Sequence, residues 1–235
     1  MPLPTDGSLT GIKQTENAAK GSTAGHFITF EGGEGAGKTT QIKRLAERLR
    51  PAGVRVVETR EPGGTKRAEA IRRLLLSGAA RPLGPEAEAI LFAAARRDHL
   101  ERLIAPELDA GHWVLCDRFL DSTRAYQGAA GLDDAKIAAL ERAAIGDTRP
   151  ELTIILDLPV KLGMDRAKGR SALDRFEQDG MAEHMRRREI FLAIAELEPQ
   201  RCRLIDATEG VETVAAAVWS TVRHRFAEFG AGRDG

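Results

Sequence analysis

A glycine-rich segment, Gly32 to Thr39, combines residues that could together bind the phosphates of a nucleotide. It matches the pattern G-x-x-x-x-G-K-[ST]. Its glycines let backbone N–H groups converge on phosphate oxygens, and the helix expected after it adds the positive end of its dipole. Lys38 is expected to reach the β- and γ-phosphates, and the Thr39 hydroxyl to hold Mg²⁺. The predicted phosphate-binding residues are Gly32, Gly33, Glu34, Gly35, Ala36, Gly37, Lys38, Thr39 and Thr40.

Two further polar segments, 117–127 and 59–65, each follow an apolar run. Asp117 ends one such run, where an acid could hold Mg²⁺, and the adjacent Arg118 could bind phosphate. The alternative is a helix-capping Asp beside a surface Arg. Arg60 stands before a rigid Pro-Gly-Gly turn, which could also be purely structural. Because ligands of open α/β sheets bind at the C-terminal ends of the strands, we expect these segments to meet in one crevice.

The elements that must position these segments alternate between short apolar runs and helical patterns. Strands are expected at 26–31, 54–58, 113–116, 152–156 and 203–205. Helices are expected at 39–50, 65–76, 85–110 with a break at Pro106, 132–145, 160–168, 181–197 and 211–229. This alternation predicts an α/β fold of three layers, in which helices cover both faces of a parallel sheet.

The composition excludes several other classes of protein. The chain has 235 residues, with 35 Lys and Arg against 35 Asp and Glu, so the balance argues against a nucleic-acid binder held by a global positive field. No apolar run approaches the ~20 residues that span a bilayer. Cys116 and Cys202 lie far apart in apolar runs and predict no disulfide, and the histidines show no zinc-ligand spacing. We expect a cytoplasmic protein that binds neither nucleic acid nor membrane.

The chain divides into one expected domain and two tails. Residues 1–25 are rich in Gly, Thr, Ser, Pro and Lys and predict a disordered extension. Residues 230–235 predict a flexible tail. The pattern between them, 26–229, shows no break that resembles a domain linker, so we expect a single domain there.

At this point the motifs resemble those of a known family, the thymidylate kinases in their bacterial form. The resemblance rests on the segments at 32–40, 60–65, 91–96 and 117–127, which occur in the family's order and spacing. It covers roughly Phe27 to Phe226. It implies the reaction ATP + dTMP → ADP + dTDP with Mg²⁺, as a step of dTTP biosynthesis. It also implies a P-loop NTPase fold with a five-stranded sheet in the order 2-3-1-4-5, and a homodimer.

The resemblance also assigns roles at the dTMP site. Phe92 would stack on thymine, and Arg96, one helical turn later, would hydrogen-bond the base. On the residues alone, Phe92 could equally be a core residue of its helix, and Arg96 would be interpreted first as a solvated arginine. Thr123 and Gln127 would hold the pyrimidine edge. Tyr126 would fill the space of a ribose 2′-OH. The remaining dTMP contacts would be Glu34 with the 3′-OH, and Arg60 and Arg118 with the acceptor phosphate. Ser122 shares the motif without an assigned contact.

The catalytic cations implied are Lys38, Arg118 and an arginine of a lid at about 166–178. The P-loop's variable positions carry no basic residue, so the resemblance places the γ-phosphate contact on Arg170 or Arg166. Gly33 and Phe119 depart from the family pattern, where a larger apolar residue and Tyr or His are common. We expect the cations to gather at the site and the cancelling acids to lie mostly on helix faces elsewhere.

Two other functions are compatible with a phosphate-binding loop of this kind. A kinase for another nucleoside monophosphate would prefer CMP or UMP. A P-loop switch would hydrolyse nucleotide without an acceptor, but a GTPase usually carries an Asn-Lys-x-Asp signature, and the single Asn of this chain is Asn17.

Overall fold

A five-stranded parallel sheet lies at the centre of the computed structural model, which describes residues 25–168, 176 and 179–227. The strands are β1 (Phe27–Glu31), β2 (Val56–Arg60), β3 (Trp113–Asp117), β4 (Leu152–Asp157) and β5 (Cys202–Asp206). They lie in the order β2-β3-β1-β4-β5, and all neighbours pair in parallel. The predicted fold class and strand order are therefore confirmed.

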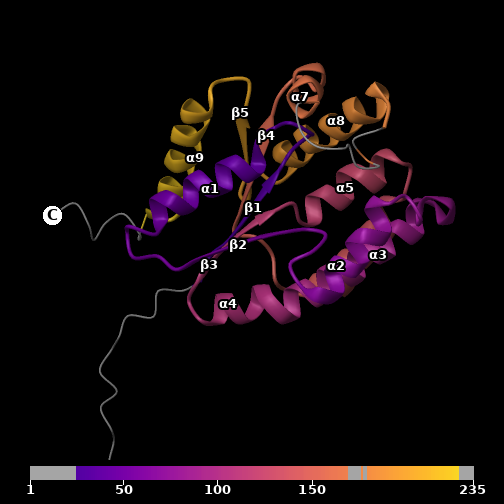
Figure 1. The fold of residues 1–235 in the computed structure, drawn as a ribbon, viewed down its shortest axis with the longest axis horizontal. Helices are drawn as coiled ribbons and strands as arrows, with labels where there is room; N and C mark the ends of the chain where they lie inside the picture. The colour runs from indigo at the N-terminus through magenta and orange to yellow at the C-terminus, as the bar shows by residue number, and fades with distance from the viewer. Residues whose placement is uncertain (1–24, 169–175, 177–178, 228–235) are drawn as a thin grey trace, which may run out of the picture.

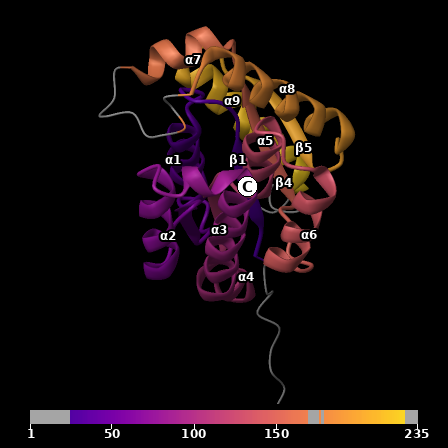
Figure 2. The same ribbon diagram turned by 90° about the vertical axis from the view of Figure 1, so that its right-hand side faces the viewer.

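Helices cover both faces of this sheet (Figures 1 and 2). They are α1 (Lys38–Leu49), α2 (Lys66–Leu76), α3 (Gly84–His99), α4 (Ala105–Asp109), α5 (Leu120–Ala129), α6 (Asp134–Ile145), α7 (Val160–Ala167), α8 (Met181–Leu197) and α9 (Val211–Arg225). A 3₁₀ turn (Arg81–Leu83) precedes α3, and a π-helical segment (Leu100–Ile104) joins α3 to α4. Within the described residues, no helix is long and apolar enough to cross a membrane.

Alternate residues of the strands point into two apolar cores, one on each face of the sheet. Ile28 and Phe30 of β1 face the core under α1 and α9, where Ile42 and Leu45 of α1 pack. Phe27 points to the opposite face, toward the core that the π-helical segment, α5 and α6 cover. This period of two, buried on both sides, is what a parallel sheet between helices requires.

Most element boundaries differ from the expected ones by one or two residues, and the larger differences lie in β2, around Pro106 and in the last helix. Strand β2 begins at Val56 and includes Thr59 and Arg60, because these two residues pair in register with Cys116 and Asp117 of β3. The break expected at Pro106 is replaced by a π-helical segment that ends two residues before the proline, so that the helical path continues from α3 into α4 with Pro106 in its first turn. The last helix ends at Arg225.

Helix α5 was not expected, because its buried positions are largely polar. Asp121 is fully buried, and its two oxygens accept from Nη1 and Nη2 of Arg201 at 2.7 and 2.9 Å. Arg201 Nη1 also donates to Thr153 Oγ1 of β4 at 2.6 Å. An ion pair therefore ties this helix to the sheet where an apolar contact would usually serve.

Replacing Arg201 by Met should strip Asp121 of its main partner and destabilise the protein by about 3 kcal/mol, because a buried carboxylate left without its cation is strongly unfavourable. Urea denaturation measures the effect. The matched control is Arg203→Met, two residues later in β5, where a half-buried arginine donates to the Cys202 carbonyl, and a loss below about 1 kcal/mol is expected. Equal losses in the two variants would contradict this account of α5.

Candidate active site

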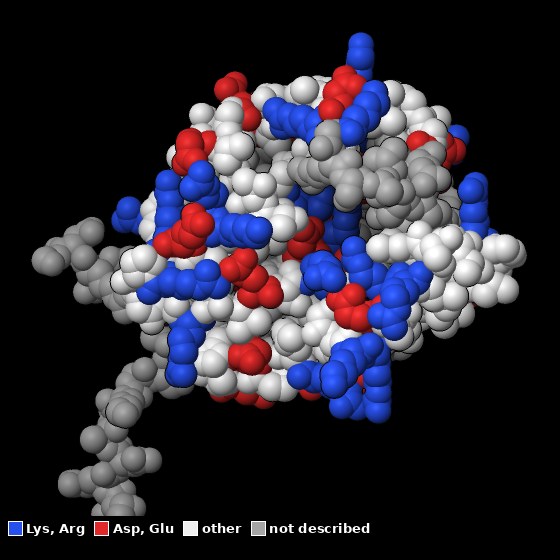
Figure 3. Space-filling model, viewed as in Figure 1, with Lys and Arg blue, Asp and Glu red and all other residues white. Residues whose placement is uncertain are grey.

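A crevice of about 230 Å³ opens at the C-terminal ends of β1, β2 and β3. Figure 3 shows basic and acidic side chains facing each other around a hollow in the middle of that face. The predicted site residues that line it are Glu34, Gly35, Ala36, Gly37, Lys38, Thr39, Arg60, Phe92, Arg96, Asp117, Arg118, Thr123, Tyr126 and Gln127. Gly32 and Gly33 line a smaller cavity behind the loop. Thr40 lies in the first turn of α1 and outside both linings.

The glycine-rich loop turns sharply into α1 and brings its lysine back over its own backbone. Gly37 precedes the helix with φ 89°, a left-handed conformation that favours glycine. Lys38 Nζ donates to the carbonyls of Gly32 and Gly33 at 3.1 and 3.0 Å. Burial, followed by repulsion from Arg118, lowers the pKa of Lys38, while Glu34 and other carboxylates oppose that shift. The ammonium group is thus held at the loop by oxygens that a phosphate could replace.

Thr39 and Asp117 supply a pair of hard oxygen ligands at the end of β3. The Thr39 hydroxyl donates to Asp117 Oδ2 at 2.6 Å, across 78 residues of sequence. Mg²⁺ takes few protein ligands in nucleotide sites and completes its shell with water and phosphate oxygens. The donor set present therefore fits this ion.

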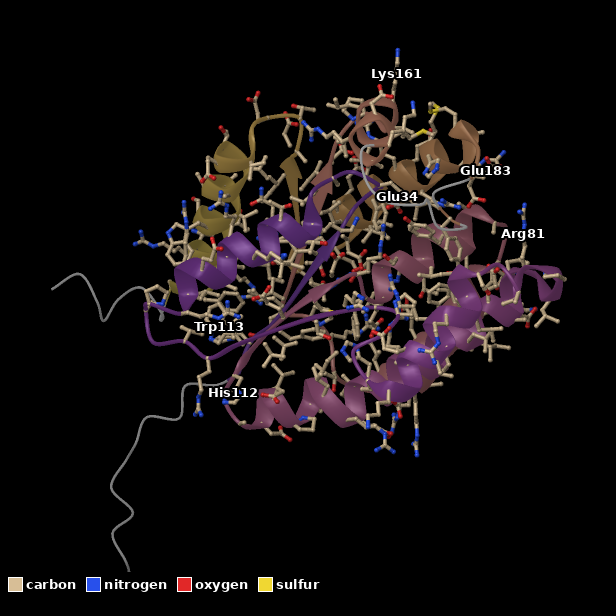
Figure 4. The ribbon with its side chains drawn as sticks, viewed as in Figure 1. Glu34, Arg81, His112, Trp113, Lys161 and Glu183 are labelled. Atoms are coloured by element: carbon tan, nitrogen blue, oxygen red, sulfur yellow. The ribbon has the colours of Figure 1, made fainter. Side chains whose placement is uncertain are left out.

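Arg118 and Glu34 form an ion pair at the centre of the crevice. Arg118 Nη2 lies 2.7 Å from Glu34 Oε1, which also accepts from the Tyr126 hydroxyl at 2.5 Å. Burial alone would raise the pKa of Glu34, but the charges of Arg118 and Lys38 hold it at about 2. Burial also raises the pKa of Tyr126, so its hydroxyl stays a donor. Glu34, a residue of the glycine-rich loop, is labelled in Figure 4.

Glu31, the last residue of β1, is a site residue that the sequence analysis missed. Its fully buried carboxylate accepts from the backbone N–H groups of Phe119 and Ser122 at 2.7 and 3.2 Å, and from the Ser122 hydroxyl at 2.6 Å. Burial raises its pKa to about 7, with the charge of Asp121 adding to the rise. Ser122 Oγ in turn accepts from Arg118 Nη1 at 3.2 Å, so Ser122 links Glu31 to the arginine of the crevice. An acid at the end of an apolar strand was the available signal.

The other end of the crevice combines aromatic rings with a buried arginine. Arg96 is only 2% exposed, so the alternative of a solvated arginine is wrong. Its Nη1 donates to Thr123 Oγ1 at 3.0 Å and its Nη2 to the Phe119 carbonyl at 2.8 Å. The guanidinium also lies 5.1 Å from the Phe119 ring. Phe92 and Tyr126 both lie near Phe176, with ring centroids 6.0 and 5.6 Å away.

Carboxylates pair with the arginines of this site, whereas we expected the acids to lie mostly on helix faces elsewhere. Arg60 pairs with Glu69, Arg96 with Glu61 and Arg118 with Glu34, at 2.9, 2.7 and 2.7 Å. The expectation failed because it treated charges only as partners of a ligand. Buried charges need partners within the protein as well.

The two lid arginines do not both fall in the described part of the chain. Arg166 lies in α7, and its terminal nitrogens donate to the carbonyls of Ala207 and Thr208 after β5, at 2.6 and 2.8 Å. These contacts hold the guanidinium against the loop after β5, and Arg166 is not among the residues that line the crevice. Arg170, with most of the expected lid, lies outside the described residues.

Comparison with known proteins agrees with this geometry. Residues 30–218 match the family model described as thymidylate kinase. The chain belongs to the thymidylate kinase family. It is 55% identical over 210 residues to a thymidylate kinase of Bradyrhizobium sp. (strain ORS 278), covering 88% of this chain and 93% of that one.

Two further relatives extend the comparison. A thymidylate kinase of Nitrobacter hamburgensis is 55% identical over 216 residues, which cover 90% of this chain and 94% of that protein. The crystal structure of thymidylate kinase from Ehrlichia chaffeensis superposes with a TM-score of 0.71 at 37% identity, covering 85% of this chain and 99% of the other. The family's kinase activity and its P-loop fold are thus assigned to this chain.

Two glycines of the loop should respond differently to an added methyl group. A Cβ at Gly35, where φ is +70°, would lie 2.0 Å from the Gly163 carbonyl of α7, whereas a Cβ at Gly33 would meet no atom within 4 Å. Gly35→Ala is therefore expected to raise the KM for ATP by about tenfold or more, because strain of 1–2 kcal/mol and the clash displace the loop. Gly33→Ala, its matched control, should stay within about twofold. Steady-state kinetics measures both, and similar values for the two variants would contradict the close packing on α7.

Proposed function

We propose that this crevice transfers the γ-phosphate of ATP to dTMP with the help of Mg²⁺. The observation that carries the proposal is that the P-loop residue Lys38 and the buried Arg96 line the same crevice. A phosphate-binding end and a base-binding end in one cavity suit a reaction that joins two nucleotides through their phosphates. Membership of the thymidylate kinase family supports the choice of substrates.

At the donor end, the loop's backbone N–H groups and the N-terminus of α1 bind the phosphates of ATP. Lys38 exchanges its carbonyl partners for β- and γ-phosphate oxygens. Thr39 and Asp117 would hold Mg²⁺, which would neutralise negative charge on the phosphates of ATP. Arg170 or Arg166 is proposed to contact the γ-phosphate at this end.

At the acceptor end, Phe92 stacks on the thymine ring and Arg96 donates to a carbonyl oxygen of the base. Thr123 and Gln127, both buried and both in the crevice lining, hold the rest of the pyrimidine edge. Tyr126 is fixed by its hydrogen bond to Glu34 and fills the space that a ribose 2′-OH would need. Glu34, kept ionised with a pKa of about 2, accepts from the 3′-OH.

Transfer itself needs positioning and charge stabilisation more than proton abstraction. The attacking atom is a phosphate oxygen that is largely ionised at neutral pH, so no strong general base is required. Arg60 and Arg118 orient the acceptor phosphate, and Arg118 with Lys38 neutralises the charge that spreads over the transferred group. A homodimer and a cytoplasmic location stay predictions.

An acceptor panel tests this function. With ATP and Mg²⁺, release of ADP should be fastest with dTMP, slower with dUMP, and slow with CMP or UMP. Without an acceptor, almost no ADP should be released. Preference for CMP or UMP would reject the choice of substrate, and full hydrolysis without acceptor would favour the P-loop switch.

Removing the central cation should slow turnover strongly. Arg118→Ala is expected to lower kcat by about 10²-fold or more, because one preorganised donor at the transferred group supplies ~3 kcal/mol. The matched control is Arg124→Ala in α5, the helix that begins two residues after Arg118. The Arg124 guanidinium pairs with Glu141 and Glu198 and lies outside the crevice lining. Its kcat should stay near that of the unaltered enzyme. Near-normal turnover in Arg118→Ala would contradict the proposed role of Arg118 in stabilising the transferred group.

A further inference from the structure

His99 is a fully buried histidine at the end of α3, and both of its ring nitrogens have partners. Nδ1 lies 3.0 Å from Glu61 Oε1, and Nε2 lies 2.8 Å from Thr59 Oγ1. A carboxylate can only accept, so Nδ1 carries a proton toward Glu61. In the neutral ring, Nε2 is then the acceptor for the Thr59 hydroxyl. The ring therefore bridges the two residues on either side of Arg60.

The second oxygen of Glu61 continues this chain of contacts to the base-binding arginine. Glu61 Oε2 accepts from Arg96 Nε at 2.7 Å, and both side chains are less than 5% exposed. Arg96 has five N–H groups, and three of them donate to Glu61, Thr123 and the Phe119 carbonyl. Among the contacts of the described residues, one N–H on each terminal nitrogen is left for a ligand.

The same ring also supports the turn that carries Arg60. Gly64, with φ +86°, packs directly on it: a Cβ there would lie 2.3 Å from His99 Nε2 and 2.8 Å from Thr59 Oγ1. The turn thus has no room to move toward α3. A single side chain fixes the backbone next to the phosphate-binding arginine and the carboxylate that aims the base-binding arginine.

We propose that His99 is a positioning residue for dTMP recognition, which holds Glu61 so that Arg96 presents its two remaining N–H groups to the thymine edge, and holds the turn of Arg60 toward the phosphate. This inference rests on the proposed function. Arginine can only donate, so an Arg96 aimed in this way donates to the O4 carbonyl of thymine and finds no acceptor in the 4-amino group of cytosine. His99 would therefore govern the choice of base without touching it.

The test compares His99→Leu, His99→Asn and His99→Gln in the full-length enzyme, with kcat and KM measured for dTMP, dCMP and ATP. His99→Leu removes both contacts and is expected to raise the KM for dTMP by about tenfold, on the scale of a lost hydrogen bond to a charged group. Its preference for dTMP over dCMP should fall by about the same factor. The KM for ATP should stay within about twofold, because the chain of contacts does not reach the P-loop lysine.

The amide variants separate the two contacts. Asn places an amide near the position of Nδ1, so it can still donate to Glu61 and should restore most of the selectivity. Gln reaches the position of Nε2 and should restore less. The comparison of His99→Asn with His99→Gln also tests the link through Glu61 if His99→Leu does not fold. Selectivity in His99→Gln equal to or above that in His99→Asn would overturn the link through Glu61.

His112→Gln is the matched control. His112 also pairs through Nδ1 with a carboxylate, Glu107, at 2.5 Å, but it stands before the first residue of β3, at the opposite end of that strand from the crevice (Figure 4). Its kinetic constants should match those of the unaltered enzyme.

The possible results distinguish the role of His99 from the proposed function. If the unaltered enzyme phosphorylates dTMP while His99→Leu keeps its dTMP KM and its selectivity, the role of His99 is overturned and the proposed function stands. If the unaltered enzyme fails to phosphorylate dTMP, the proposed function falls, and this inference falls with it.

Discussion

A row of carboxylates along one edge of the sheet is the constraint on which the crevice depends. Glu31, Asp117, Asp157 and Asp206 are the last residues of their strands, and Glu61 follows β2 directly. Parallel strands bring all of these ends to one edge. Each acid must find hydrogen-bond donors where it is buried, and the partners it finds are the side chains that line the site or hold its walls.

The consequence is that the cations of the site are held before any phosphate arrives. Glu61 fixes Arg96, and Glu34 fixes Arg118. Asp157 accepts two bonds from Arg188 and so anchors α8 beside the crevice. A flexible arginine loses rotamer freedom when it binds a ligand. Where a carboxylate has already ordered the side chain, this rotamer entropy is lost during folding and not during binding. The ligand then binds to a preorganised donor.

The sequence predicted the sheet and the phosphate loop well, because both depend on short local patterns. The apolar runs and their alternation with helices led to the strand number, and the motifs led to the family and thus to the strand order. The pairing of acids with cations could not be read in the same way. Glu61 and Arg96 are 35 residues apart, and Thr39 and Asp117 are 78 apart. Helix α5 also escaped prediction, because its buried face carries Asp121, Thr123 and Gln127. Ion pairs and hydrogen bonds replace the apolar contacts that periodicity detects.

The order of the arginine side chains in the ligand-free enzyme tests this account most directly. NMR relaxation of the Arg96 Nε–H group, measured without dTMP or ATP, reports how firmly Glu61 holds the side chain on the ps–ns timescale. Preorganisation predicts an order parameter close to that of rigid backbone, about 0.85, with little change on adding dTMP. A value below about 0.6 that rises only when dTMP binds would contradict it.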